Sequence, residues 1–288
     1  MTQSSKGRGK SKPVRVIAVT SGKGGVGKTN VTANLALALT QAGRKVLVWD
    51  ADLGLANIDV LLGLKPQYNI SHLLNGEKTL REILVTGPGG FSILPASSGV
   101  QELTHLGGDQ KRSLLSELDE YEDDLDFLLI DTGAGVGENV TYFNAAAQQR
   151  LVVVTSEPTS IFDAYGLIKV MVNKYKQKRF QILPNQVKDD QEAKKVYSVL
   201  AGVADIHLDS ISLDYLGFIP KDDLLPKAVK KQKAVLDAYP ASEAGKSFKA
   251  LAQKLLSYRK DDQDSGGLQF FWKRLEEAVR SVDGSVQR

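Results

Sequence analysis

The sequence predicts an α/β protein with a doubly wound, mostly parallel β-sheet and helices on both faces. Three observations predict this fold class. Short apolar runs alternate along the chain with stretches whose apolar residues recur at helical spacing. A glycine-rich segment joins the first apolar run to the first helical stretch. Aspartates follow two of the apolar runs, at the strand ends that line the ligand crevice of such sheets.

The first strand is expected at 14–19 and the first helix from Val31 to Ala42, with Gly43 as its C-terminal stop. Between them, Gly22-x-x-x-x-Gly27-Lys28-Thr29 matches the P-loop pattern at every fixed position. Glycines let successive N–H groups point at one centre, and the following helix adds the positive end of its dipole. We therefore expect Lys28 to contact nucleotide phosphates and Thr29 to ligate Mg²⁺. The expected phosphate-binding segment comprises Gly22, Lys23, Gly24, Gly25, Val26, Gly27, Lys28, Thr29 and Asn30.

Acidic residues follow two further predicted strands. Asp50 and Asp52 lie at the end of the apolar run 46–49. Four apolar residues, 127–130, precede Asp131 in the Walker B pattern, and a glycine-rich segment, 132–137, comes next. We expect Asp131 to hold the Mg²⁺ shell and the glycine-rich segment to move near the γ-phosphate. Asp50 and Asp52 are two residues apart at the strand end, and we expect only one of them to point easily at the phosphates.

The remaining periodicity completes the predicted alternation of strands and helices. Further strands are expected at 91–95, 151–154, 181–183 and 215–219. Further helices are expected at 55–62, from Asp109 through Leu118, at 164–175, and from Ser242 to Tyr258. These elements predict one large domain over 14–260.

Composition narrows the possible function classes. The 288 residues are 42% hydrophobic and 25% charged, which is ordinary for a globular protein. The net charge of +3 gives no bulk argument for nucleic-acid binding, and the absence of cysteine excludes disulfides, thiolate metal sites and a cysteine nucleophile. No apolar run approaches the roughly 20 residues that a membrane span requires. We therefore expect a cytoplasmic protein.

The two ends differ from the predicted domain. Residues 1–13 are rich in Ser, Gly and basic residues, which predicts a disordered basic tail. A polar linker at 261–267 precedes 268–282, where large apolar residues share one helical face. Such a helix can lie at a membrane interface, enter a partner's groove, or dock on its own domain. Because Glu276 and Glu277 dilute its positive charge, attraction to anionic lipid is expected to be weak and reversible.

Lys23 adds a second lysine to the P-loop, giving KGGVGKT, and here the sequence resembles the deviant Walker A class of MinD/ParA ATPases. The segments DADLGLANIDVLLG, LPASSG and EPTSIFDAYGLIK are most similar to the flagellar-number regulators, the FlhG/FleN branch. The resemblance implies the MinD/ParA (SIMIBI) type of P-loop fold, ATP and Mg²⁺ as cofactors, an ATP-bound homodimer and slow hydrolysis to ADP and phosphate. It also implies restraint of a flagellar transcriptional activator of the FleQ/FlrA type, action with the GTPase FlhF, and reversible membrane contact through 268–282.

The resemblance also assigns roles to individual residues. It implies that Lys23 reaches the partner's phosphates, that Asp52 orients the attacking water, and that Asp50 lies near the Mg²⁺ shell. Asn185 matches an adenine-reading asparagine, and Pro220 and Asp222 lie in the second base-contacting loop. Glu157 is expected near the partner's ribose. Residues 1–13 contain nothing like the DQA-type segment with which some FlhG proteins stimulate FlhF, which favours the antiactivator role.

These observations favour an ATP-driven dimerisation switch that regulates flagellar number and placement. The alternative within the ATPase class is a ParA-like partition protein with ATP-dependent, non-specific DNA binding, for which Lys227, Lys230, Lys231 and Lys233 form a candidate basic cluster. We expect DNA binding to be the weaker hypothesis, because a solvated helix face explains the same lysines. A P-loop small-molecule kinase is a third hypothesis, but it gives Lys23 no role.

Overall fold

The computed structural model describes residues 13–52, 57–95, 116–118, 121–122, 124–257 and 267–283. Nearly all of the predicted basic tail, most of the linker and the helix expected from Asp109 fall outside these ranges, apart from the last turn of that helix. The strands are β1 (Arg15–Ser21), β2 (Val46–Ala51), β3 (Val85–Thr86), β4 (Ser92–Leu94), β5 (Phe127–Ala134), β6 (Gln149–Val154), β7 (Arg179–Val187), β8 (Ser212–Tyr215) and β9 (Ile219–Pro220).

The helices that cover this sheet are of very different lengths. The longer ones are α1 (Lys28–Gln41), α7 (Glu138–Ala146), α8 (Pro158–Tyr175), α9 (Asp190–His207), α12 (Glu243–Ser257) and α13 (Leu268–Asp283). The short ones are α2 (Ile58–Leu62), α3 (Ile70–Leu74), α4 (Leu80–Ile83), η1 (Pro88–Gly90), α10 (Leu224–Lys230) and α11 (Val235–Ala238).

The sheet confirms the predicted fold class. Its nine strands run in the order β3-β4-β2-β5-β1-β6-β7-β8, with β9 paired to β7, and every pairing except β3 with β4 is parallel. The strand β1 lies between β5 and β6, and all seven of its residues are buried. The glycine-rich segment therefore leaves the sheet from its centre, where parallel sheets of this kind bind ligands.

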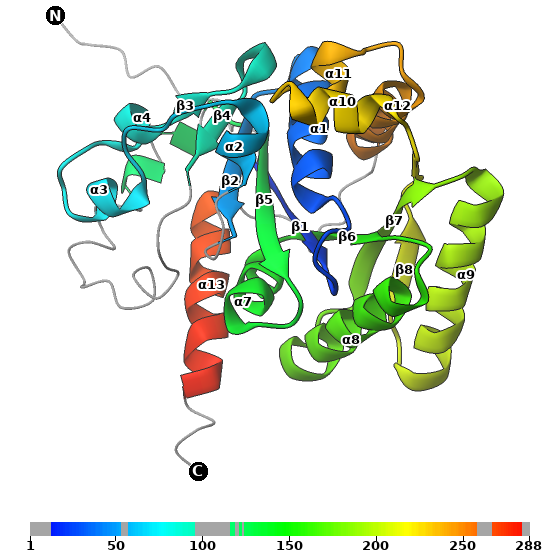
Figure 1. The fold of residues 1–288 in the computed structure, drawn as a ribbon. Helices are drawn as coiled ribbons and strands as arrows, with labels where there is room; N and C mark the ends of the chain where they lie inside the picture. Colours follow the sequence, from blue (N-terminus) through cyan, green and yellow to red (C-terminus); the bar gives the residue numbers. More distant parts are fainter. Residues whose placement is uncertain are drawn as a thin grey trace, which may run out of the picture.

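Helices cover both faces of the sheet (Figure 1). One core cluster contains buried residues of α7, α8, α9 and α13, and the other contains buried residues of α1, α11 and α12. Successive strand residues contribute to opposite clusters, with Val16 and Ala18 in the first and Ile17 and Val19 in the second. This alternation explains why the central strands are continuous apolar runs, since both of their faces are covered.

The C-terminal amphipathic helix docks on the chain's own domain. Its buried side chains Phe271 and Trp272 lie against Trp49 of β2, with ring centroids 6.3 and 5.4 Å from the Trp49 ring. Phe143 of α7 completes the cluster with an edge contact to Trp49 at 5.1 Å. The sequence left three binding sites open for this helix: a membrane interface, a partner's groove and its own domain. In the structure the helix packs on its own domain, against the sheet and α7 (Figure 1).

The single strand predicted over 215–219 is wrong. The structure has β8 ending at Tyr215 and β9 beginning at Ile219, both paired with β7. Gly217 between them has φ +126°, a conformation that L side chains rarely adopt and that breaks a strand. The sequence did not reveal this break, because Leu216 is buried as deeply as a strand residue and the apolar run therefore continues without interruption.

Candidate nucleotide-binding site

The predicted P-loop lies at the carboxyl end of β1 and leads into α1, which begins at Lys28. Gly25 and Gly27 have φ values of +78° and +94°, so the loop curls as the motif requires. Gly22 is required for a different reason. A Cβ at that position would lie 2.0 Å from the carbonyl oxygen of Asp163, so the P-loop backbone packs directly on the backbone of α8.

Lys28 is held inside the site. Its side chain is buried and its ammonium donates to the Ser21 hydroxyl at 3.0 Å. Burial lowers the pKa of Lys28, while the charges of Asp131 and Asp52 oppose that shift. The phosphates of a nucleotide would supply the negative charge that a buried ammonium needs.

Asp131 has the environment of a metal-shell carboxylate. It is fully buried, Oδ1 accepts from the Thr32 hydroxyl at 3.1 Å, and Oδ2 has no hydrogen-bond partner among the described residues. Burial, reinforced by the neighbouring charge of Asp50, raises the pKa of Asp131 to about 7, although a hydrogen bond from Thr29 acts in the opposite direction. The raised pKa of Asp131 and its unpartnered oxygen fit a divalent cation, which would favour the charged form of this carboxylate.

A magnesium ion here would use few protein ligands. The described residues contain no group of three or more His, Cys, Asp or Glu side chains that could hold a metal by themselves. Mg²⁺ commonly takes one or two protein oxygens together with substrate phosphates and water. Thr29 and Asp131 are the residues that fit this role.

Asp50 and Asp52 have separate environments, because Asp50 lies within β2 while Asp52 lies beyond its last residue, Ala51. Residues two apart on a strand share a face, so strand alternation does not separate them. Asp50 is buried opposite Asp131 in the β2–β5 register, and its pKa rises to about 6 because of burial. Its oxygens already accept from the backbone N–H groups of Asp52, Asn57 and Ile58 at 3.0–3.2 Å. Asp50 therefore anchors the start of α2, a role that the sequence did not indicate.

Asp52 lies between Lys28 and Gly133, which is near the end of β5. Its charge acts on Lys28, and its Oδ1 is 3.4 Å from the position that a Cβ on Gly133 would take. The structure therefore brings together Lys28, which begins α1 after β1, Asp52, which follows β2, and Asp131 of β5. These three parallel strands are neighbours in the sheet.

Asn185 braces the P-loop. It is buried near the end of β7, its amide donates to the Val26 carbonyl at 2.7 Å, and a Cβ on Gly27 would collide with that amide nitrogen at 2.7 Å. This contact explains why Gly27 must lack a side chain.

Pro220 is the last residue of β9, and Asp222 follows it at a cavity of about 800 Å³. Asp222 lines this cavity and accepts from the N–H groups of Leu224 at 2.8 Å and Ala244 at 3.0 Å. The cavity is also lined by Ser156, Gln186, Lys188 and Lys221, which sequence reasoning missed because they belong to no motif. Its position next to Asn185 makes it a candidate site for the base and ribose.

Lys23 and Glu157, both expected to act across a dimer, contact each other within one chain. The Lys23 ammonium pairs with the Glu157 carboxylate at 2.5 Å and donates to the Thr159 hydroxyl at 2.9 Å. Both charged side chains are substantially exposed. The second lysine of the P-loop thus reaches the N-terminal end of α8 in the monomer.

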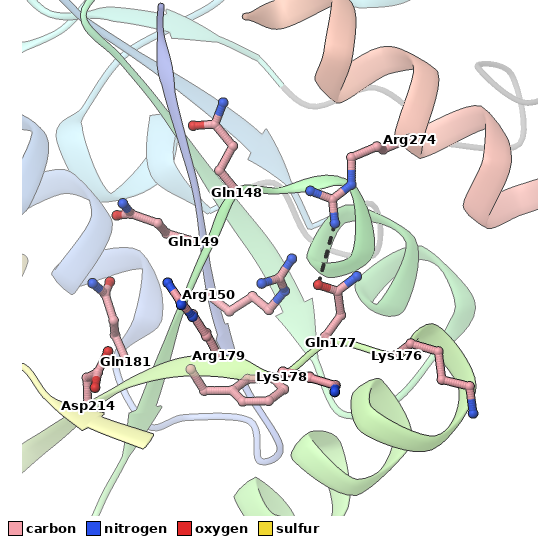
Figure 2. A pocket seen from close by; sticks show the side chains of 11 residues that line it. Gln148, Gln149, Arg150, Lys176, Gln177, Lys178, Arg179, Gln181, Asp214 and Arg274 are labelled. Carbon is pink, nitrogen blue, oxygen red and sulfur yellow. Dashed lines mark hydrogen bonds between the residues drawn. The ribbon is translucent and has the colours of Figure 1, made fainter. Parts of the chain in front are cut away.

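A second cavity, of about 280 Å³, lies at the opposite edge of the sheet, where β6 and β7 begin (Figure 2). Its lining includes five basic side chains and Asp214, but none of the residues expected to bind nucleotide. The basic residues are Arg150, Lys176, Lys178, Arg179 and Arg274. The buried Arg150 guanidinium donates to the carbonyls of Asn144 and Ala147 at 2.8 and 2.6 Å, so part of this charge stabilises the end of α7.

Comparisons with known proteins agree with this site. A family model described as ParA, NUBPL iron-transfer P-loop NTPase, matches residues 12–256. The chain has no cysteine, so it lacks the thiolates that usually hold iron–sulfur clusters.

Individual proteins are also similar over most of their length. The antiactivator FleN of Pseudomonas aeruginosa is 48% identical over 93% of this chain and 95% of its own. The flagellum site-determining protein YlxH of Helicobacter pylori is 37% identical over 91% of this chain and 89% of its own. The solved MinC:MinD cell division protein complex of Aquifex aeolicus gives a TM-score of 0.65 at 27% identity, over 86% of this chain and 98% of the matched one. With its P-loop geometry, central parallel sheet and these matches, the chain belongs to the ParA family of P-loop NTPases.

Proposed function

We propose that this protein is an ATP-dependent dimerisation switch that limits flagellar number by restraining a flagellar transcriptional activator. The observation that carries this proposal is the similarity to the antiactivator FleN, which extends over 93% of the chain. The described nucleotide site supports it, because the residues that a MinD-like ATPase needs converge at one end of the sheet. The similarity to YlxH, a flagellum site-determining protein, points to the same biological role.

The chain's own residues suggest how the cycle would run. Lys28 and the P-loop N–H groups would bind the phosphates, and Thr29 and Asp131 would hold Mg²⁺, which supplies charge neutralisation at the γ-phosphate when bound. Asp52 would orient the attacking water, since it lies beside Lys28 and next to the glycine-rich segment. The glycine-rich segment, 132–137, would then report the loss of the γ-phosphate.

Dimerisation would require Lys23 to change partners. In the monomer its ammonium is held by Glu157 and Thr159, and a surface ion pair of this kind is worth roughly 0.2–1 kcal/mol. The triphosphate of a second subunit would offer much more negative charge than one carboxylate. We infer that ATP-bound dimer formation exchanges the intrachain pair for a contact across the dimer, whereas ADP leaves the pair in place.

Light scattering tests the switch directly. The Asp52→Ala protein should be monomeric with ADP and dimeric with ATP and Mg²⁺, because it binds but does not hydrolyse the nucleotide. Lys28→Ala should abolish nucleotide binding and remain monomeric in both conditions. An Asp52→Ala protein that stays monomeric with ATP and still hydrolyses it would overturn the assignment of Asp52.

The partners are proposals of the same kind. The regulated partner would be an activator of the FleQ/FlrA type, with FlhF as a second partner. No helix among the described residues is long and apolar enough to cross a membrane. Contact with a membrane would therefore be peripheral, through release of α13 from its position against Trp49. A ParA-like role predicts instead salt-sensitive binding to DNA of any sequence that appears only with ATP, and the same preparations test it.

A further inference from the structure

The cavity of about 280 Å³ where β6 and β7 begin is lined by polar side chains that are buried in the sheet. Gln149 and Arg150 are the first two residues of β6 and are 8% and 4% exposed, and Gln181 of β7 is 4% exposed. Buried positions in parallel strands are normally apolar, as they are in the rest of β6. A polar group at such a position is costly unless it has a hydrogen-bond partner, so each one calls for a partner in or beside the cavity.

Two of these side-chain amides have groups without a partner. The Gln181 amide forms no hydrogen bond with a described residue, and its oxygen is buried. The Gln149 oxygen accepts from the Arg15 guanidinium at 2.9 Å, but the Gln149 amide nitrogen donates to no described residue. Buried side-chain amides are nearly always hydrogen-bonded in folded proteins. Two such groups in the lining of one cavity fit a polar ligand that has both acceptor and donor atoms.

The charge of the cavity determines which polar ligand it fits. Its lining has one acidic side chain, Asp214, against five basic ones, so the lining keeps a net positive charge whichever of them Asp214 pairs with. Arg150 and Lys176 donate to backbone carbonyls, which carry no net charge. Lys178 forms no ion pair with another described residue. An anion would supply the matching charge, and guanidinium and amide N–H groups suit the oxygens of a phosphate.

The cavity is shared between the sheet and α13. Arg274 is the residue that α13 contributes to the lining, and its guanidinium donates to the side-chain oxygen of Gln177 at 3.4 Å (Figure 2). This distance is long for an N–H···O hydrogen bond, so the direct contact is weak. A phosphate held by Arg274 and by the basic residues of β6 and β7 would join the helix to the sheet through charge-assisted hydrogen bonds.

We propose that this cavity binds a small phosphate ester that also carries a hydroxyl group. The phosphate oxygens accept from the Gln149 amide nitrogen and from the basic side chains, including Arg274, and the hydroxyl donates to the buried Gln181 oxygen. A volume of about 280 Å³ lies at the lower limit for ligand pockets, so it suits a compact phosphate ester better than a whole nucleotide. Phosphate monoesters occur both as free solutes and as lipid headgroups, and the test below separates these two sources.

A ligand at this cavity holds α13 in its docked position. Because it contacts both the helix and the sheet, it binds the docked state more tightly than the released state and shifts the equilibrium toward docking. This consequence rests on the release of α13 in the proposed function, whereas the binding site itself does not depend on the proposed function.

Calorimetric titration of the full chain with glycerol 3-phosphate tests the site, at constant ionic strength and with chloride as the reference anion. We expect saturable one-to-one binding that is equal in Lys28→Ala, because the probe does not occupy the P-loop. Gln181→Leu should weaken this binding by about tenfold, since it removes hydrogen bonds to the ligand. The same variant should raise the denaturant midpoint, because it removes an unpartnered buried amide. Damage to the fold cannot produce both changes together.

Charge variants provide matched controls. Lys178→Gln removes an exposed charge from the cavity and should weaken binding, whereas Lys249→Gln removes an equally exposed lysine on α12, outside the lining, and should have no effect. Arg274→Gln tests the link to α13. With glycerol 3-phosphate at ten times its Kd, the hydrogen-exchange protection of 268–283 should rise by up to about tenfold in the natural chain and should not rise in Arg274→Gln.

Vesicles that contain phosphatidic acid identify the source of the phosphate. Recruitment of the chain that is lost in Gln181→Leu assigns the cavity to a lipid headgroup, and binding of glycerol 3-phosphate without such recruitment assigns it to a soluble ligand. The proposal is overturned if glycerol 3-phosphate does not bind saturably, if Gln181→Leu binds it as tightly as the natural chain, or if Lys28→Ala abolishes the binding. Normal binding of glycerol 3-phosphate in a chain that shows no ATP-dependent dimer would overturn the proposed function alone.

Discussion

Replacing Phe271 by alanine should release α13 from the domain. Phe271 is 1% exposed and its ring lies 6.3 Å from Trp49 and 5.7 Å from Trp272. Truncating a core phenylalanine costs about 3–5 kcal/mol. The four large buried side chains of α13, namely Leu268, Phe271, Trp272 and Leu275, together contribute roughly 6–12 kcal/mol at about 1.5–3 kcal/mol each. Ordering the chain of α13 opposes docking, so losing the Phe271 contribution should shift the helix toward release.

Hydrogen exchange and tryptophan fluorescence report the release separately from global unfolding. Amides of 268–283 should lose most of their protection in Phe271→Ala, and fluorescence should shift to the red because both tryptophans of the chain, Trp49 and Trp272, lie in this cluster. The free energy of unfolding of the rest of the domain, measured with denaturant, should fall by less than about 3 kcal/mol. The helix is released in this variant, so the remaining core does not contain the full cavity left by Phe271. Phe270→Ala, on the same helix but 41% exposed, is the control and should change stability by no more than about 0.5 kcal/mol.

Two results would refute this reasoning. If Phe271→Ala keeps full protection of 268–283 while the whole domain loses about 3–5 kcal/mol, α13 is an integral part of the core and no release step exists. If protection, fluorescence and stability all stay as in the natural chain, the docking against Trp49 is wrong. The expected release also predicts stronger co-sedimentation of Phe271→Ala than of Phe270→Ala with anionic vesicles, because the apolar face would be free to bind them.

Three further perturbations test the nucleotide site. Gly22→Ala places a Cβ 2.0 Å from the Asp163 carbonyl oxygen, so it should lower the thermal midpoint and abolish nucleotide binding. Asn185→Ala removes the brace on the Val26 carbonyl and should weaken ATP and GTP equally, whereas a base-reading role predicts a selective loss for ATP, measured by calorimetry. Without nucleotide or Mg²⁺, stability should fall as pH rises from about 4 to about 7, as followed by denaturant unfolding. Asp131 and Asp50, with pKa values raised to about 7 and about 6, hold protons in the folded state that the unfolded chain has already lost.

Each of these perturbations has a matched control. Gly24→Ala should be tolerated, since the nearest atom to its added Cβ would be 3.9 Å away. Asp131→Asn should remove the larger part of the pH dependence and leave the smaller part that is due to Asp50, and an unchanged slope in this variant would contradict the assignment. For Asn185→Ala, a fall in ATP affinity with unchanged GTP affinity would show that Asn185 recognises adenine and that its contact with the P-loop is not its main role.

The sequence predicted the centre of the fold well because that information is local. The buried strands are continuous apolar runs, and the P-loop and Asp131 follow directly from them, so short patterns are enough to place Lys28, Thr29 and Asp131 at one edge of the sheet. The break between β8 and β9 could not be predicted in the same way. It depends on the backbone conformation of Gly217, while the burial of Leu216 continues the apolar run across it.

Contacts between distant segments were the second kind of information that the sequence did not give. The resemblance placed Asp50 near the metal, but its oxygens also hold the N–H groups at the start of α2, a contact that depends on how the chain turns after β2. Asn185 was expected to face a base, and the described contact is with the P-loop carbonyl of Val26, 159 residues earlier in the chain. Such roles require the tertiary structure, because neither residue carries a local pattern for them.

The same long-range contacts explain how a nucleotide could control a distant surface. The P-loop touches α8 at two places: the backbone of Gly22 packs on the carbonyl of Asp163, and Lys23 contacts Glu157 and Thr159. Since the first contact involves two backbones with no side chain between them, the P-loop cannot rearrange around phosphates without α8 sensing it. Phe162 precedes Asp163 and is 73% exposed, so the part of α8 that meets the P-loop also carries a large apolar side chain that is open to a partner. Because α8 contacts the P-loop on one side and exposes Phe162 on the other, it needs no further element to link nucleotide binding to partner binding.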